Sequence, residues 1–284
     1  MYQLSVVIAA KNASKTIEAT LQSVESLQNY IPTEIIVVDD YSSDDTFSKC
    51  TTFANVKCLK NPDPCGAAYA RNFGVRCSSS ELICVLDSDD LIVPSVILLS
   101  VKRLQSLSHI DLIFGKRIDF EIKGRNSIKI YRMFPKKFDI STIQSWFAHF
   151  SNPITHSGTI FRKKWFNRVG GYNVSMKYAY DFDLWRRGFS GNNYQFSNEI
   201  VCYYRTSDIG LGGTRHFEYW KREYLSSRNS NIKTLTSGSA TLFVRYSIYT
   251  IVTLLKYFYF IVFDRQLIQH AKIFIDDNSA SLSE

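Results

Sequence analysis

The sequence predicts an α/β protein built around a mostly parallel sheet, and three observations support this prediction. Up to residue 87, short apolar and β-branched runs alternate four times with segments of helical spacing. The connections between them are short, which is typical of βαβ units. The apolar runs are continuous rather than alternating, which indicates strands that are covered on both faces of a sheet.

The elements of this first half follow in order along the chain. The runs predicted as strands are 4–10, 34–40, 56–59 and 81–87. The segments predicted as helices are 14–28, 42–54 and 67–79. Ser14 stands where a helix-capping residue is expected, and Pro94 opens a further helix because proline suits the first helical turn.

The pattern changes after residue 110. Residues 111–122 and 127–134 predict the strands of a hairpin, with its turn near 124–126. The shorter elements predicted beyond them are a helix over 141–150, a strand, helix and glycine stop over 158–172, a helix over 181–189 and a strand over 199–205.

Charge and cysteine content restrict the class of protein. The chain has 284 residues, of which 45% are hydrophobic, and this is enough for a sizeable core. Its formal net charge of +8 favours acidic partners such as nucleotide phosphates, nucleic acid or an anionic membrane surface, without choosing among them.

None of the six cysteines forms a C-x-x-C pair, so we expect reduced thiols and a cytosolic compartment. The N-terminal segment is too short and too strand-like for a signal peptide.

The tail after residue 210 differs in composition from the rest. Residues 217–228 predict an aromatic and basic helix, and residues 242–263 form an apolar stretch with many tyrosines and two cations, Arg245 and Lys256. This stretch is long enough to span a membrane, which takes about 20 apolar residues. Its composition leaves three alternatives: a span, an interfacial amphipathic helix, or a helix packed on the domain or on a partner.

Carboxylates crowd the carboxyl ends of two predicted strands. Three acids follow one strand within four positions and two end the other; they are Asp87, Asp89, Asp90, Asp39 and Asp40. Ligands of open parallel sheets bind beside the carboxyl ends of the strands. We therefore expect both acidic groups to face one crevice.

A divalent cation would explain this crowding of acids. Two carboxylates about 5 Å apart repel each other by about 3 kcal/mol at an effective dielectric constant near 20. Mg²⁺ or Mn²⁺ removes this repulsion, prefers hard oxygen ligands and typically binds one or two carboxylates together with substrate phosphates. The alternatives are that these acids face solvent, cap the helix at Pro94, or pair with Arg71 or Arg76.

Five motifs, in this order, resemble those of inverting glycosyltransferases of family 2. They are VVIAAKN (6–12), IIVVDDYSSDDT (35–46), CGAAYARNFGVRCSSSELICVLDSDD (65–90), THSGTIFRKKWFNRVGGYN (155–173) and YAYDFDLWRR (178–187). The resemblance covers residues 3–205 and implies the GT-A fold, a nucleotide-sugar donor, and a metal ion that bridges the donor's diphosphate. It also implies a role in bacterial surface-polysaccharide biosynthesis, of which lipopolysaccharide is an example.

The resemblance implies roles at the donor site. Asp40 would hydrogen-bond the base, usually uracil, and Asp89 with Asp87 would bind the metal ion. Arg71 would lie near the donor phosphates, which suit a guanidinium, with an internal salt bridge as the alternative. Gly66 would let the backbone approach the nucleotide closely. The full set expected at the donor or the metal is Ala9, Asn12, Asp39, Asp40, Gly66, Arg71, Asp87, Ser88 and Asp89.

The chain departs from the family pattern in two places. AAKN (9–12) stands where the family often has Pro-x-Tyr-Asn, so an aromatic residue that stacks on the base is missing there. Lys11 could meet phosphate instead. Tyr180 stands where the family often has the glutamate of a Glu-Asp pair.

Asp181 matches the aspartate of that pair, and the resemblance makes it the general base. Inversion needs an acceptor hydroxyl to attack the anomeric carbon from the face opposite the leaving diphosphate, and a carboxylate takes its proton. Asp183 is the competing candidate, and two positions along a helix point apart, so we expect at most one of the two at the site. The alternative is that both merely favour a helix N-terminus.

The acceptor site is expected to involve Trp185 and His156, again by resemblance. A core tryptophan and a satisfied structural histidine are the alternatives. Arg205 falls where the family carries a loop that can fold over the nucleotide, and Arg215 and His216 in the glycine-rich stretch beyond it are candidate phosphate contacts. An ordinary linker is the alternative for this stretch.

These observations together predict a metal-dependent inverting glycosyltransferase of the hexosyltransferase type. We expect a UDP-sugar donor, a glycan or lipid-linked saccharide acceptor, and no nucleic acid partner. Residues 1–110 would form the nucleotide-binding half and 111–210 the acceptor half of one domain, and 211–284 a flexible loop and helical tail. The protein would work in the cytoplasm at the inner face of a bacterial membrane, with peripheral contact through 242–263.

Two other classes of protein stay as alternatives. A metal-dependent nucleotidyltransferase uses a related sheet, but it needs a glycine-rich basic loop after the first strand, and AAKNASKT lacks these glycines. A non-enzymatic module that binds nucleotides or nucleic acid would account for the basic charge, but it leaves the crowded acids unexplained.

Overall fold

The computed structural model of the protein describes residues 2–122, 128–133, 152, 154–176, 179–189 and 193–206. Some of the predicted features therefore lie outside the described residues. They are the turn near 124–126, the helix over 141–150, the candidate contacts Arg215 and His216, the helix over 217–228 and the stretch over 242–263.

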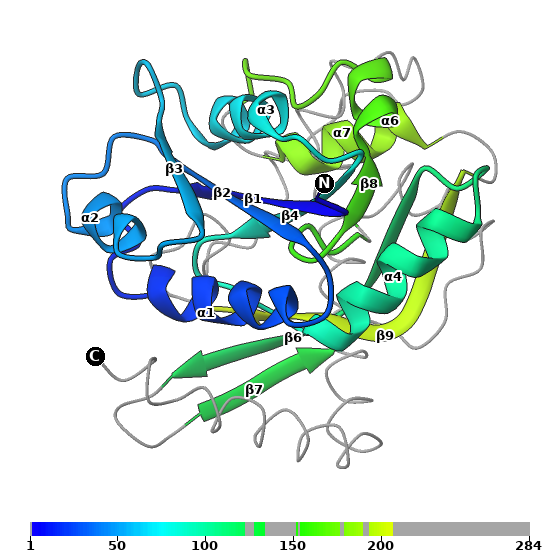
Figure 1. The fold of residues 1–284 in the computed structure, drawn as a ribbon, viewed down its shortest axis with the longest axis horizontal. Helices are drawn as coiled ribbons and strands as arrows, with labels where there is room; N and C mark the ends of the chain where they lie inside the picture. The colour runs from blue at the N-terminus through cyan, green and yellow to red at the C-terminus, as the bar shows by residue number, and fades with distance from the viewer. Residues whose placement is uncertain are drawn as a thin grey trace, which may run out of the picture.

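Nine strands of the described residues form one sheet (Figure 1). They are β1 (Leu4–Ala10), β2 (Thr33–Asp39), β3 (Val56–Lys60), β4 (Leu82–Asp87), β5 (Leu91–Ile92), β6 (Leu112–Ile122), β7 (Ile128–Met133), β8 (Ile160–Arg162) and β9 (Tyr194–Arg205). The order across the sheet is β3-β2-β1-β4-β8-β6-β9-β5, and β7 pairs with β6 beside this path.

The first half of the sheet is parallel, which confirms the predicted βαβ organisation. Strands β3, β2, β1 and β4 all run the same way. Beyond them, β8 is antiparallel to both β4 and β6, while β9 is parallel to β6. The predicted hairpin is present as the antiparallel pair β6 and β7. The sheet is therefore mixed, and its parallel part carries the strand ends at which acids were expected.

Helices cover both faces of this sheet. They are α1 (Ile17–Gln28), α2 (Thr46–Thr51), α3 (Ala67–Cys77), α4 (Pro94–Ser106), α6 (Lys163–Arg168) and α7 (Tyr180–Gly188). Helices α1 and α4 lie on one face, and α3, α6 and α7 lie on the other (Figure 1). The second of these faces carries the aromatic residues of α6 and α7.

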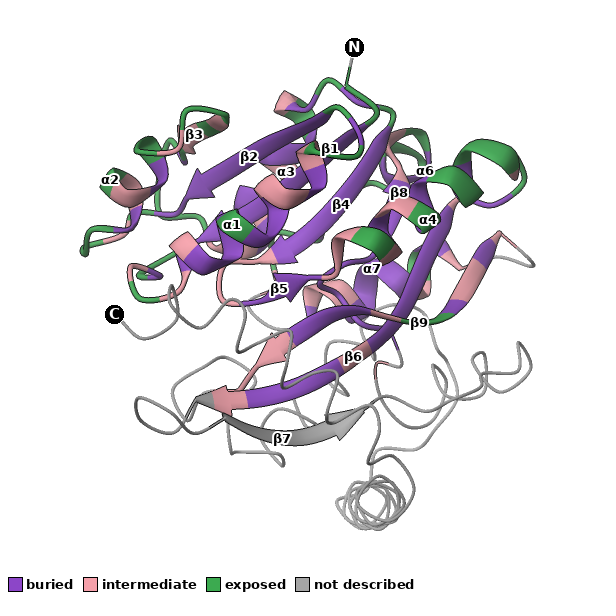
Figure 2. Cartoon of the chain, turned by 60° about the horizontal axis from the view of Figure 1, so that its bottom comes forward, coloured by how far each residue is buried: buried purple, intermediate pink, exposed green. Residues whose placement is uncertain are grey.

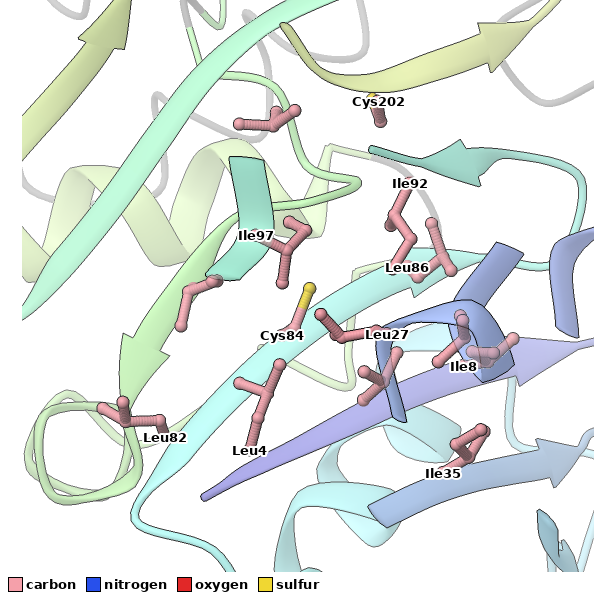
Figure 3. Close-up of a cluster of buried hydrophobic side chains, with 14 of the residues drawn as sticks. Leu4, Ile8, Leu27, Ile35, Leu82, Cys84, Leu86, Ile92, Ile97 and Cys202 are labelled. Atoms are coloured by element: carbon pink, nitrogen blue, oxygen red, sulfur yellow. The ribbon is translucent and has the colours of Figure 1, made fainter. Parts of the chain in front are cut away.

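The two faces have separate hydrophobic clusters, and β1 contributes to both. Val6 and Ile8 belong to the cluster under α1 and α4, while Val7 belongs to the cluster under α3, α6 and α7. Figure 3 shows Leu27 and Ile97 in the first cluster. Because successive side chains of a strand point to opposite faces, a strand covered on both sides must be apolar throughout. This is why the central strands are buried along their length in Figure 2.

Two helix starts differ from the prediction. Helix α1 begins at residue 17, and Ser14 does not cap it: Thr16 is the N-cap residue, and the Ser14 N–H donates instead to Oδ2 of Asp44 at 3.1 Å. Helix α2 begins at Thr46 rather than at residue 42. In both cases residues predicted as helix belong to loops that bond to each other across the sheet edge.

All six cysteines are free thiols, as predicted. Across the described ranges, no helix combines the length and the apolar character needed to cross a membrane.

Helix α3 packs closely on the sheet through Gly74. A Cβ atom at Gly74 would lie 2.5 Å from Cγ1 of Val7 and 3.2 Å from Cγ2 of Val38. We expect Gly74→Ala to lower the free energy of unfolding by about 1–2 kcal/mol, because the cost of overpacking exceeds the gain in helix propensity. Urea unfolding measures the change. Val7→Ala in the same chain should recover part of the loss, and strictly additive effects would contradict the predicted contact.

Candidate active site

The carboxyl ends of β1, β2 and β4 lie side by side at one edge of the sheet. In the parallel register, Ala10 pairs with Asp39 and Ala9 pairs with Asp87. Ser88 and Asp89 belong to the turn that follows β4. The two acidic strand ends therefore lie at one edge of the sheet, and the expectation that they face one crevice stays a prediction.

Asp40 is buried at this edge and is already well bonded. Its Oδ1 accepts hydrogen bonds from Nδ2 of Asn61 at 2.7 Å and from the N–H of Gly66 at 3.1 Å. Its Oδ2 accepts hydrogen bonds from the same N–H of Gly66 at 3.2 Å and from Nζ of Lys11 at 3.3 Å. The Lys11 side chain is 52% exposed, so it is the partner that a ligand can displace most readily.

Two neighbours of Asp40 are fixed in different ways: Gly66 by its backbone conformation and Asp39 by a hydrogen bond of its side chain. Gly66 has φ +85°, a left-handed value that favours glycine, and a Cβ there would meet nothing within 4 Å. Conformation rather than space therefore requires glycine at this position. Asp39 accepts the N–H of Ser42 through Oδ2 at 3.2 Å, and its Oδ1 is buried without a partner.

The loop after β1 is fastened to the loop after β2. The N–H of Asn12 donates to Oγ of Ser42 at 2.9 Å, and Oδ1 of Asn12 accepts the N–H of Ser43 at 2.8 Å. The N–H of Ala13 donates to Oγ1 of Thr46 at 2.7 Å. Asn12, which was expected at the donor, thus shapes the edge through these loop contacts.

Asp44 completes this fastening. Its Oδ1 accepts hydrogen bonds from the N–H and the hydroxyl of Thr46, and its Oδ2 accepts the N–H of Ser14. Asp44 is an exposed residue, and its slight desolvation would raise its pKa, but the hydrogen bonds from Thr46 and Ser14 outweigh this and lower the pKa to about 2.

We expect Asp44→Ala to cost about 0.5–2 kcal/mol of stability, because the exposed hydrogen bonds that hold Thr46 and Ser14 are lost. Because the pKa of Asp44 in the folded protein lies below its ordinary value of 3.8, this contribution is present above about pH 4 and is lost as the pH falls through about 2. Urea unfolding at pH 7 and at pH 3 measures it. Asp44→Asn keeps an acceptor oxygen and should retain part of the stability. Equal unfolding free energies of wild type and Asp44→Ala at pH 7 would contradict the prediction.

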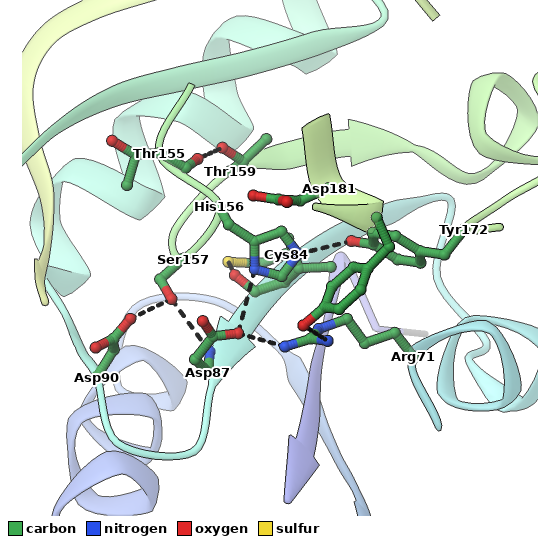
Figure 4. Close-up of polar contacts among 12 residues, drawn as sticks. Arg71, Cys84, Asp87, Asp90, Thr155, His156, Ser157, Thr159, Tyr172 and Asp181 are labelled. Atoms are coloured by element: carbon green, nitrogen blue, oxygen red, sulfur yellow. Dashed lines mark hydrogen bonds and ion pairs between the residues drawn. The ribbon is translucent and has the colours of Figure 1, made fainter. Parts of the chain in front are cut away.

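Asp87 is the centre of a polar network at the end of β4 (Figure 4). Its Oδ1 accepts a hydrogen bond from Arg71 at 2.5 Å and lies 3.2 Å from Nδ1 of His156. Nε2 of His156 lies 2.9 Å from the hydroxyl of Tyr172. Burial alone would raise the pKa of Asp87, but Arg71 and His156 hold it well below its usual range. Asp87 is therefore ionised, and His156 is a buried histidine with both ring nitrogens bonded.

Arg71 connects this acid to the start of α7. Besides the ion pair with Asp87, its guanidinium donates to the hydroxyl of Tyr180 at 2.8 Å. The side chain of Arg71 is only 4% exposed. Of the two alternatives for Arg71, the structure shows the internal salt bridge, and the phosphate contact stays a prediction.

Asp90 supports the turn after β4 from the inside. It is fully buried, and its carboxylate accepts the N–H of Arg205 at 2.9 Å and the hydroxyl of Ser157. Burial, with the charges of Asp89 and Asp87, raises the pKa of Asp90 well above its ordinary value. The N-cap residue of α4 is Val93, and no side chain caps that helix. The alternative that Asp90 caps the helix at Pro94 is therefore wrong.

Nearby cations balance the charge of Asp89 less fully than that of Asp87. Its backbone carbonyl accepts a hydrogen bond from Nε of Arg205 at 3.2 Å. Burial and the nearby charge of Asp87 raise the pKa of its carboxyl group to about 6. The fold therefore holds two acids, Asp87 and Asp89, closer together than their charges favour. Ser88 between them presents its carbonyl to the hydroxyls of Thr16 and Thr20.

This set of donors fits a hard divalent cation that takes its other ligands from phosphates. Carboxylate oxygens suit Mg²⁺ and Mn²⁺, and a cation would remove the repulsion that raises the pKa of Asp89. Within the described parts of the chain, no group of three or more His, Cys, Asp or Glu side chains could hold an ion by itself. The residues therefore fit an ion that one or two carboxylates share with a bound diphosphate.

The two acids of α7 have different surroundings. Asp181 is partly exposed in the first turn, and its Oδ2 accepts a hydrogen bond from Nδ2 of Asn152 at 2.7 Å. Asp183 is buried and paired with Arg187 at 2.8 Å. Only Asp181 is left with a carboxylate that a substrate can reach, and it is drawn with the Asp87 network in Figure 4.

Trp185 is a core residue in this structure. Its side chain is 0% exposed and stacks on Trp165, with ring centroids 6.1 Å apart. Its ring centroid lies 6.2 Å from that of His156. Direct contact of Trp185 with an acceptor is therefore not supported, because its side chain is fully buried. His156 is likewise 8% exposed and holds Asp87 rather than facing outward.

Several residues of the network were not found from the sequence. Tyr172 orients His156, Ser157 bridges the Asp90 carboxylate and the Asp87 N–H, and Asn152 holds Asp181. Ser157 follows His156 directly in the T-H-S-G motif, which was the available signal for it. Tyr172 lies in the same motif, 16 positions after His156, but nothing in the motif shows that its hydroxyl meets that ring. Asn152 lies outside the five motifs, 29 positions before Asp181.

The fold and the site define an α/β protein with acidic residues at the carboxyl ends of its parallel strands. A comparison with family models identifies the family: the model of glycosyl transferase family 2 matches residues 5–170. The chain belongs to this family.

Relatives of similar sequence also carry names of glycosyltransferases. The chain is 34% identical over 129 residues, 45% of its length, to an Escherichia coli protein named UDP-Glc:alpha-D-GlcNAc-diphosphoundecaprenol beta-1,3-glucosyltransferase WfgD. Curated relatives are spanned in part only, 66% and 49% of their length for two of them.

Two solved structures show the same GT-A fold. Staphylococcus aureus TarS 1-349 in complex with UDP-GlcNAc superposes with a TM-score of 0.60 at 17% identity, over 98% of this chain and 81% of that one. Mannosyltransferase PcManGT from Pyrobaculum calidifontis, in complex with GDP-Man and Mn²⁺, gives a TM-score of 0.59 at 14% identity, over 99% and 85%. At these identities the likeness concerns the fold alone.

Proposed function

We propose that the protein is a metal-dependent inverting glycosyltransferase that moves a sugar from a UDP-sugar to a saccharide or lipid-linked saccharide acceptor. The observation that carries the proposal is the link through Arg71. This one guanidinium contacts both Asp87 at the end of β4 and Tyr180, the residue before Asp181. The link supports a site in which the acids suited to a metal–diphosphate group and the candidate base act on one substrate.

The proposed chemistry is a direct displacement. Asp181 takes the proton of the acceptor hydroxyl while the acceptor oxygen bonds to the anomeric carbon. The bond from that carbon to the diphosphate oxygen breaks at the same time, so the configuration inverts. Asp89 and Asp87 would hold the divalent ion, which when bound neutralises charge on the leaving diphosphate.

Donor recognition is assigned to the ends of β1 and β2. Asp40 would accept a hydrogen bond from the base after Lys11, its most exposed partner, moves away. Lys11 is then free to approach phosphate. Residues 1–110 form the nucleotide-binding half and 111–210 the acceptor half in this proposal.

The names of similar proteins support the choice of substrates. The Escherichia coli relative is named for a UDP-glucose donor and an acceptor linked to diphosphoundecaprenol. The Staphylococcus aureus structure contains UDP-GlcNAc, and the Pyrobaculum calidifontis structure contains Mn²⁺ with GDP-Man. We infer a role in bacterial surface-polysaccharide biosynthesis, at the cytoplasmic face of the membrane and with peripheral contact through residues 242–263.

A donor screen tests this proposal. The full chain is incubated with UDP- and GDP-sugars and a polyprenyl-diphosphate-linked saccharide, with Mn²⁺, with Mg²⁺ or with a chelator, and the released nucleotide is identified. Release of UDP that depends on acceptor and metal is expected, with a product of inverted configuration. Release of pyrophosphate would indicate a nucleotidyltransferase instead, and equal turnover in the chelator would remove the metal from the proposal.

A further inference from the structure

Tyr41, the residue directly after Asp40, has an unusual backbone conformation. Its φ is +57°, in the left-handed region where a side chain with a Cβ is strained. Glycine would fit this position without strain. Such strain tends to persist at functional sites, so the presence of a large aromatic residue here needs a reason beyond the turn itself.

Packing does not supply that reason. The Tyr41 side chain is 51% exposed, so it contributes little to a core. Within the described parts of the chain, Tyr41 is the one large exposed hydrophobic residue at the carboxyl ends of the parallel strands. The other four are Tyr2, Tyr30, Leu99 and Val174, which lie before β1, before β2, in α4 and after α6.

The ring of Tyr41 is nevertheless held in place. Its hydroxyl donates a hydrogen bond to the carbonyl of Pro62 at 2.7 Å. Asn61 and Gly66, at the two ends of the same loop after β3, donate to the carboxylate of Asp40. One loop therefore fixes both an exposed aromatic ring and the acid that precedes it. A fixed, exposed ring beside a hydrogen-bond acceptor is the arrangement that a planar heterocycle with N–H groups can use.

The neighbouring loop offers no other aromatic ring. Residues 9–16, AAKNASKT, contain none, and they are bonded to the loop that follows Tyr41 through Asn12 and Ser42. This loop therefore cannot supply an aromatic contact to a ligand beside Asp40, whereas Tyr41 follows that acid directly.

We propose that Tyr41 is the platform on which the nucleobase of the donor stacks, with Asp40 as the hydrogen-bond acceptor for the edge of that base. The inference rests on the proposed function, because it concerns the nucleotide of the same donor. It makes Tyr41 a determinant of nucleotide affinity and gives no role to it in the transfer step.

Calorimetric titrations of the full chain test this. UDP and inorganic pyrophosphate, each with Mn²⁺, are titrated into wild type, Tyr41→Ala, Tyr41→Phe and Tyr41→Trp. We expect Tyr41→Ala to weaken UDP binding about 5- to 150-fold, the effect of losing one base-stacking aromatic side chain, and to leave pyrophosphate binding unchanged. Phe and Trp keep a ring and should keep most of the affinity. Tyr30→Ala, which removes a 62% exposed tyrosine elsewhere, is the matched control and should change neither titration.

Tyr41→Gly separates binding from stability. Because glycine relieves the left-handed strain, its Tm should be no lower than that of wild type, while its affinity for UDP falls as in Tyr41→Ala. UDP affinity that is unchanged in Tyr41→Ala, or an equal loss for UDP and pyrophosphate, overturns the inference. Wild type that fails to bind UDP with Mn²⁺ would instead remove the proposed function on which the inference rests.

Discussion

Asp181→Asn is expected to reduce sugar transfer by about 10²- to 10⁴-fold, the usual contribution of a positioned general base. The amide has nearly the shape of the carboxylate but cannot take the acceptor proton. Asp181 lies on α7, away from the loops that hold Asp40, so UDP affinity with Mn²⁺ should stay near the wild-type value. Initial rates of UDP release and calorimetric titration of UDP measure the two quantities separately.

Asp183→Asn is the matched control for this prediction. It makes the same chemical change two residues along the same helix, but it removes an ion pair with Arg187, which also donates to the carbonyls of Val169 and Gly171. We therefore expect a lower Tm and a rate of transfer near that of wild type below the unfolding transition. Asp181 is not the base if its variant keeps near wild-type turnover, and the assignment moves to Asp183 if the two results are exchanged.

The parallel half of the fold could be predicted because its signals are local. Its central strands β1, β2 and β4 are largely apolar and buried, and both of their faces are covered by neighbouring helices. Strand β5 has only two residues, and β9 begins at Tyr194 rather than at residue 199 because its first residues pair with β6. Pairing with a strand some 80 positions away is a tertiary property that no local pattern reveals.

The same distinction applies to the site. Acids at strand ends could be found because their residue type and position are both visible in the sequence. The surroundings of His156 and Trp185 could not, because burial depends on partners from other elements. His156 meets Asp87 across 69 positions of the chain, and Trp185 stacks on Trp165 of another helix. The prediction that Ser14 caps α1 was wrong for the same reason. The N–H of Ser14 donates to Asp44 of the next loop, and the helix begins later, at Ile17.

Asp89→Ala is expected to weaken UDP binding in the presence of Mn²⁺ by at least about 10- to 100-fold. This is the range seen when groups that merely support metal ligands are removed, and Asp89 is proposed as a ligand itself. Binding of UDP in a chelator should be weak in both proteins and should differ little between them. Asp111→Ala, which removes a carboxylate paired with Arg168 elsewhere on the protein, is the control and should leave metal-dependent binding unchanged.

The stability of the metal-free protein gives an independent test of the same residue. The pKa of Asp89 in the fold, about 6, lies above its ordinary value of 3.8, so the folded state favours the protonated form. The stability that this provides is fully present below about pH 4 and is lost as the pH rises through about 6. At pH 7 without metal, Asp89→Asn should therefore be more stable than wild type by up to about 3 kcal/mol, because it removes the charge that burial and Asp87 disfavour.

Mn²⁺ with UDP should raise the Tm of wild type and not that of the variant. A variant that is less stable than wild type without metal, or that gains as much from Mn²⁺ and UDP, would show that Asp89 is held for structure and not for a cation.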